Sequence, residues 1–97
     1  MEKLVAHFYD LIASDERINS NHVLLYMTLV SCSIRNNIQN PVSISRQEVM
    51  KASKIQATAT YHKGMRELNA YGYIRYIPSY HPHLRSIVYF PEYENTG

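Results

Sequence analysis

The feature of this sequence that most constrains the fold is the apolar stretch "VLLYMTLVSCSI" at residues 23–34. We predict that it forms a helix, capped by Ser20 or Asn21 and continuing to about Arg35. A helix that is apolar on nearly all sides is buried among other elements, so we expect this one to be the central core helix. Its broad face holds Val23, Leu24, Met27, Val30 and Ile34, and Leu25, Tyr26 and Leu29 widen that face.

The segments around this helix give shorter signals. The helical spacing of apolar residues predicts an amphipathic helix over residues 3–13. "NNIQNP" ends the central helix, because Pro41 disfavours a helical conformation in the residue before it. "VSIS" then predicts a very short strand. Ser45 followed three residues later by Glu48 is a capping box, which predicts the start of a helix that continues to about Ala52.

A further helix is predicted at about 57–70. Its inward seam consists of Tyr61, Met65 and Leu68. Gly64 lies beside the seam, and because Gly costs about 1 kcal/mol relative to Ala inside a helix, its presence indicates the close approach of another helix. Gly72 should end the helix with a positive φ. "YIRYIP" and "RSIVYF" then predict two strands, separated by the loop "SYHPHL".

These elements define a predicted core and leave one apolar surface without a packing partner. The core should contain Val23, Met27, Val30, Val49, Ile55, Tyr61, Met65, Leu68 and Ile74. The strand "YIRYI" is apolar on both faces, with Ile74 and Tyr76 on one and Tyr73 and Ile77 on the other. The extra face needs a partner, which is either the first helix of the same chain or another subunit, since tyrosine is enriched at interfaces.

Length and composition describe an ordinary globular chain. Ninety-seven residues, 45% of them hydrophobic and 19% charged, suffice for one domain with one modest core. No apolar run approaches the roughly 18 residues that cross a bilayer, and the Met-Glu-Lys start is unlike a signal segment, so we expect a cytoplasmic protein. Cys32 is the one cysteine, and we expect a reduced, buried thiol there.

Positive charge is concentrated in one part of the chain. The net charge is +2, but residues 46–85 alone carry +5, from seven basic and two acidic residues. The first 45 residues carry −1 and the last 12 carry −2. This asymmetry is expected where a domain meets phosphate, although a solvated surface with uneven charge is the simpler interpretation.

The order helix, helix, short strand, helix, turn, helix, strand, loop, strand is that of a winged helix-turn-helix. The stretch "ISRQEVMKASKIQATATYHKGMRELNAYGYIRYI" resembles winged-helix transcription regulators and phage-type replication organisers. Those families share an acid and apolar pair, a polar start to the recognition helix, and then Leu, three residues, Gly and an apolar pair. The matching residues are Glu48, Val49, Thr58 to Thr60, Leu68, Gly72, Tyr73 and Ile74. More narrowly, "ATYHKGMRELNAYGYIRYIPSYHP" is similar to small regulators found near bacterial mobile elements.

The resemblance covers about residues 20–90 and implies a single domain, mainly α with a small β-hairpin (α+β). Residues 1–19 would add an N-terminal helix and linker, and 91–97 a tail. It also implies duplex DNA as partner, a role in transcription regulation or mobile-element replication or excision, and a homodimer formed through residues 3–13. We expect no cofactor.

The turn before the second helix of the motif departs from the family pattern of Gly, an apolar residue and then Ser or Thr. This chain has Lys54, Ile55, Gln56 and Ala57 there. Alignment on Leu68 places Ile55 at the glycine position, whereas alignment on the apolar residue of the turn requires one extra residue.

The helix at about 57–70 is the element that the resemblance places in the major groove. Its outward residues should be Thr58, Ala59, His62, Lys63, Arg66 and Asn69. Short Thr and Ala side chains permit close approach to the bases, and Lys63 and Arg66 are long enough to reach guanine or phosphate. Arg46, Lys51 and Lys54 on the preceding helix and turn, and Tyr80, His81 and Arg85 on the wing at about 78–86, would contact the backbone.

Other functions are less well supported by the residues. His81 and His83 flank a proline, but a zinc site normally takes four ligands, so we expect no metal. The sequence has no glycine-rich phosphate loop and no nucleophile elbow, and we expect no enzyme. The alternative that stays open is a winged helix that binds a protein partner through its tyrosines, without sequence-specific DNA binding.

Overall fold

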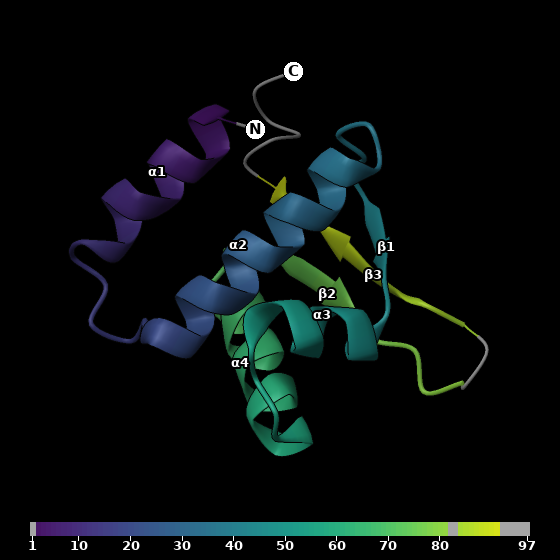
Figure 1. Cartoon of the computed structure of the whole chain (residues 1–97). Helices are drawn as coiled ribbons and strands as arrows, with labels where there is room; N and C mark the ends of the chain where they lie inside the picture. Colours follow the sequence, from purple (N-terminus) through teal and green to yellow (C-terminus); the bar gives the residue numbers. More distant parts are fainter. Residues whose placement is uncertain (1, 82–83, 92–97) are drawn as a thin grey trace.

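The computed structural model describes residues 2–81 and 84–91, and in this part of the chain four helices and three short strands follow the predicted order (Figure 1). The bounds are α1 Glu2–Ile12, α2 Ser20–Arg35, β1 Val42–Ile44, α3 Arg46–Ser53, α4 Thr58–Ala70, β2 Arg75–Ile77 and β3 Ser86–Tyr89. The fold is of the mixed α+β class, as predicted. Most of the predicted tail lies outside the described residues. No helix among the described residues is both long and apolar enough to cross a membrane.

The three strands form one antiparallel sheet with the order β1-β3-β2. Val88 of β3 is its centre, paired with Val42 on one side and Tyr76 on the other. Val42, Ile44 and Val88 are fully buried, so one face of this small sheet belongs to the core. Figure 1 shows α2 crossing the middle of the molecule, with α1 along one side and the strands behind it.

The central helix α2 is buried as expected, but on a different face. Its buried apolar residues are Leu25, Tyr26, Leu29 and Val30. Leu24 and Ile34 are exposed, so the predicted broad face is wrong at these two positions, whereas Val23 and Met27 are partly buried and pack against the core. The reason is the position of the neighbouring helices: Tyr26 stacks on Phe8 of α1, with ring centroids 3.8 Å apart. Sequence periodicity does not say which side of an all-round apolar helix meets which neighbour.

The start of α2 also differs from the prediction. The N-cap is Asn19, not Ser20 or Asn21: its side chain accepts from the His22 backbone N–H at 3.2 Å. In return, Nδ1 of His22 accepts from the Asn19 backbone N–H at 3.0 Å, which completes a capping box with histidine in the place usually taken by Glu or Gln.

The other predicted core residues are confirmed. Val30, Val49, Ile55, Tyr61, Met65, Leu68 and Ile74 are all buried. Gly64 lies at the contact between α4 and α2, where a Cβ atom would overlap Cδ1 of Leu25. Gly72 has φ +87°, as expected for a residue that ends a helix in the left-handed region. Cys32 has a free thiol but is only half-buried, not buried as expected, and this burial raises its pKa.

The turn between α3 and α4 resolves the alignment left open by the sequence. Lys54, with φ +64°, has the left-handed conformation, so the assignment of Ile55 to the glycine position is wrong. Ile55 is instead the buried apolar residue of the turn, and its N–H donates to the Met50 carbonyl at 3.1 Å. This bond closes the end of α3 in the manner of a Schellman motif.

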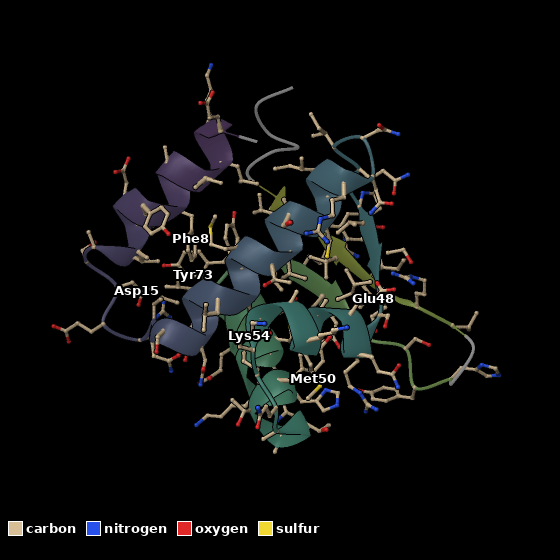
Figure 2. All side chains as sticks on the ribbon, in the orientation of Figure 1. Phe8, Asp15, Glu48, Met50, Lys54 and Tyr73 are labelled. Carbon is tan, nitrogen blue, oxygen red and sulfur yellow. The ribbon has the colours of Figure 1, made fainter. Side chains whose placement is uncertain are left out.

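A polar cluster fastens the α1–α2 linker to the segment that follows α4. Arg17 donates to both carboxylate oxygens of Asp15, each at 2.9 Å, and the Tyr73 hydroxyl donates to the same carboxylate at 2.6 Å. The Arg17 guanidinium lies 4.1 Å from the centre of the Tyr71 ring. Tyr73 also packs edge-on against Phe8 of α1, so this residue of the extra apolar face has its partner in the same chain, whereas Ile77 of the same face is 43% exposed. Figure 2 shows Phe8, Asp15 and Tyr73 together at this place.

We predict that Gly64→Ala lowers the free energy of unfolding by up to about 2 kcal/mol, because overpacking costs about 1–3 kcal/mol and the gain in helix propensity is about 1 kcal/mol. Leu25→Ala alone should cost about 2–5 kcal/mol. If the two side chains meet, the double variant should be more stable than the summed losses predict, by at least about 0.5 kcal/mol. Urea denaturation of the four proteins measures this coupling, and strict additivity would contradict the contact.

We also predict a pH-dependent contribution from Asp15. The hydrogen bond from Arg17, and then the one from Tyr73, hold the pKa of this carboxyl well below its usual range. A lowered folded-state pKa stabilises the fold above the unfolded pKa of about 3.9 and loses that contribution as the pH falls further. Asp15→Asn should therefore lower the melting temperature at pH 7, and the difference from the wild type should shrink between about pH 4 and pH 2. Asp10→Asn, at an exposed position of α1, is the control. A difference that does not depend on pH would contradict the role of the charge.

Candidate nucleic-acid interface

The outward face of α4 is the predicted one. Tyr61, Met65 and Leu68 are at most 1% exposed, which fixes the rotation of the helix. Four of the predicted contact residues are exposed, and His62 is half-buried with its ring edge-on to Tyr61. The four are Thr58, Ala59, Lys63 and Arg66. The sequence therefore identified this exposed face correctly.

The acidic residue of α4 does not belong to this face. Glu67 accepts from Nε2 of the buried His22 at 3.1 Å and from the Tyr71 hydroxyl at 3.0 Å. Because Nδ1 of His22 is an acceptor, its ring proton lies on Nε2. Burial acts to raise the pKa of Glu67, but these hydrogen bonds outweigh it and hold the pKa below its ordinary value. The exposed charged side chains of α4, Lys63 and Arg66, are thus both basic.

A groove runs between the start of α3, the middle of α4 and the hairpin formed by β2 and β3; we refer to it as the α3–hairpin groove. It is lined by five predicted contact residues from three separate segments: Arg46, His62, Tyr80, His81 and Arg85. Lys51, Lys54, Lys63 and Arg66 are exposed but do not line it. The fold thus divides the predicted residues into two sets, one in the groove and one on α4 and the end of α3.

Arg85 is held in a defined position at the edge of this groove. Its Nε donates to Oγ of Ser43 at 3.0 Å, and one terminal nitrogen donates to the Ser43 carbonyl at 3.3 Å. The same nitrogen forms an ion pair with Glu48 at 2.9 Å. Glu48 therefore does not complete the predicted capping box: Ser45 accepts from the Glu48 N–H, but the carboxylate turns to Arg85. Sequence reasoning missed this pair, because its members are 37 residues apart.

Tyr61 places a buried hydroxyl behind the groove. This oxygen has no hydrogen-bond partner among the described residues. Burial raises the pKa of Tyr61, and the neighbouring Tyr76 adds to the shift, so the phenol stays protonated at neutral pH. Its role is to fill the core under His62 rather than to exchange protons.

The hairpin loop carries two strongly exposed apolar side chains. Tyr80 is 89% exposed and Leu84 is 65% exposed. Tyr80 was predicted as a contact residue from the sequence, but Leu84 was not. Only the exposure of Leu84 in the structure marks it as a candidate contact residue. Pro82 and His83, which entered the metal interpretation, lie outside the described residues. Within residues 2–81 and 84–91, no three His, Cys, Asp or Glu side chains gather as a metal site would require.

Comparison of the chain with protein-family models, with curated proteins and with solved structures gave no match. What the protein does must therefore be inferred from the exposed face of α4, the α3–hairpin groove and their charges.

Proposed function

We propose that this protein binds duplex DNA and reads its sequence with α4, as a winged helix-turn-helix protein with an added N-terminal helix. In this proposal α3, the turn at Lys54 and α4 form the helix-turn-helix, and the β2–β3 hairpin is the wing. Its biological role would be transcription regulation or assistance to a mobile element. The order of elements and the antiparallel three-stranded sheet are compatible with this architecture.

The observation that carries the proposal is the composition of the outward face of α4. Thr58 and Ala59 are short and permit the helix to approach base edges, where Thr and Ala also contact the thymine methyl group. Lys63 and Arg66 reach further, and both are suited to guanine or phosphate. A merely solvated helix normally mixes acidic and basic residues, whereas here Glu67 is withdrawn into hydrogen bonds with His22 and Tyr71.

The α3–hairpin groove supports the same partner. Arg46 at the start of α3 and Arg85 just before β3 both line it, and both are exposed. In protein–DNA complexes such side chains bind phosphate and fix the position of the protein, while the groove-reading helix supplies the specificity. The groove would then follow one strand of the backbone beside the major groove that α4 enters.

The alternative is a winged helix that binds a protein partner, and exposed apolar side chains on and just after α2 favour it. Leu24, Ile34 and Ile38 are each more than two-fifths exposed. A homodimer through α1 is also only a proposal: Leu4 and Phe8 of this helix are buried within the same chain, so Tyr9 and Leu11 would have to form the contact. Salt dependence separates the two functions, because binding to several phosphates weakens steeply with salt and an apolar interface does not.

We predict that mutations can separate recognition of the bases by α4 from binding to the phosphate backbone. Arg66→Ala should cost about 1–3 kcal/mol on the preferred duplex and relax the preference at one base position, because a base contact would be lost. Lys51→Ala should instead weaken binding to all duplexes alike and reduce the salt slope by about one. The measurements are selection of bound sequences from random duplexes and titrations of the selected site at several salt concentrations.

Lys3→Ala is the matched control, since it removes one lysine from the exposed surface of α1. It should leave both the affinity and the base preference nearly unchanged. Equal losses from all these variants, with the base preference intact, would contradict sequence reading by α4. A wild-type protein that binds no duplex at low salt would support the protein-partner alternative.

A further inference from the structure

The ion pair between Arg85 and Glu48 needs an explanation other than stability. Its side chains are 48% and 63% exposed, and pairs this open contribute little, typically about 0–1 kcal/mol. Glu48 lies in the first turn of α3, where the helix dipole already favours a negative charge. Figure 2 shows Glu48 at the end of α3 that lies next to the sheet and the hairpin. The pair therefore lies at the surface where the proposed DNA backbone would run.

Glu48 is also the acid that a bound duplex would meet. Residues 46–85 contain two acidic residues, Glu48 and Glu67. Glu67 is 30% exposed, and both its carboxylate oxygens accept hydrogen bonds, from His22 and Tyr71. Glu48 keeps its charge on the outer surface, beside a groove otherwise lined by basic and neutral side chains.

We propose that Glu48 is a built-in competitor for the phosphate group that Arg85 binds, and so limits the affinity for every duplex. A carboxylate oxygen and a phosphate oxygen are alternative acceptors for the same guanidinium. In the free protein Glu48 is paired with the Arg85 guanidinium, while Ser43 holds the guanidinium in place by accepting two further hydrogen bonds from it. A DNA strand entering the groove must exchange places with Glu48 and accept a negative charge close to its phosphates.

This inference rests on the proposed function and adds a consequence to it. The cost of displacing Glu48 is the same for all duplexes, because Arg85 lies outside the face of α4 that reads bases. Only duplexes that also satisfy α4 would recover that cost from base contacts. Glu48 would thus keep the protein from being held by DNA in general, where binding rests on phosphate contacts alone.

The test is Glu48→Gln, which removes the charge, keeps the side-chain length and leaves the backbone N–H that Ser45 caps. We expect binding to both a preferred and a scrambled duplex to tighten by about 3- to 10-fold near 100 mM salt, with a salt slope steeper by up to about one. The ratio between the two duplexes should not change. Fluorescence anisotropy from 50 to 200 mM KCl measures all three quantities. Glu2→Gln, which removes an acid from the first turn of α1, is the matched control and should change little.

A second comparison shows whether Glu48 acts through Arg85. In the Arg85→Ala background, the gain from Glu48→Gln should be smaller than in the wild type, because no guanidinium is left to release. An equal gain in both backgrounds would overturn the competition and leave a general charge effect. If the wild type binds DNA and Glu48→Gln does not raise the affinity, the inference is overturned and the proposed function is left intact. If neither protein bound a duplex at 50 mM KCl, the proposed function and the inference would both be overturned.

Discussion

The close contact between Gly64 and Leu25 is the constraint on which the orientation of α4 depends. A side chain at residue 64 would overlap Cδ1 of Leu25, so a larger residue there would have to displace the Leu25 side chain or separate the two helices. Tyr61, Met65 and Leu68 can then reach the core together and are fully buried. Since these side chains fix the rotation of α4, they decide that Thr58, Lys63 and Arg66 face outward. The side-chain composition of the exposed face of the helix is thus presented to solvent as a consequence of the packing on the other side.

Polar contacts complete this arrangement at the far end of α4. His22 both closes the capping box of α2 and donates to Glu67, so one buried ring links the start of the central helix to the last turns of α4. The Tyr71 hydroxyl donates to Glu67, and the Arg17 guanidinium lies over the face of the Tyr71 ring. Arg17 in turn donates to Asp15. The α1–α2 linker is therefore tied to the end of α4 by the cation–π contact of Arg17 with Tyr71, and to the following segment by the charge-assisted hydrogen bond from Tyr73 to Asp15. Loss of α1 or its linker would loosen α4 itself.

The sequence predicted features that depend on neighbours in the chain and missed those that depend on distant ones. The inward seam of α4 and the left-handed Gly72 follow from helical spacing and local backbone preference, and both are confirmed. The rotation of α2 could not be predicted, because a helix with apolar residues on most sides gives no sign of which neighbour covers which side. The Arg85–Glu48 pair was missed for a similar reason: Glu48 has a good local role as a capping residue, and only the fold offers it a cation 37 residues away.

The two acidic residues of the basic segment show how far a net charge can mislead. Summed along residues 46–85, Glu48 and Glu67 count equally against the basic side chains. In the structure Glu67 is satisfied by His22 and Tyr71, whereas Glu48 is opposed to a single exposed arginine. The lowered pKa of Glu67 keeps its carboxylate ionised, so its charge still acts on Lys63 and Arg66, whereas the charge of Glu48 is offset by that of Arg85. If DNA is the partner, the pairing of Arg85 with Glu48 lowers the share of the affinity that the wing supplies, and substitutions on α4 should be tolerated less well than those on the wing.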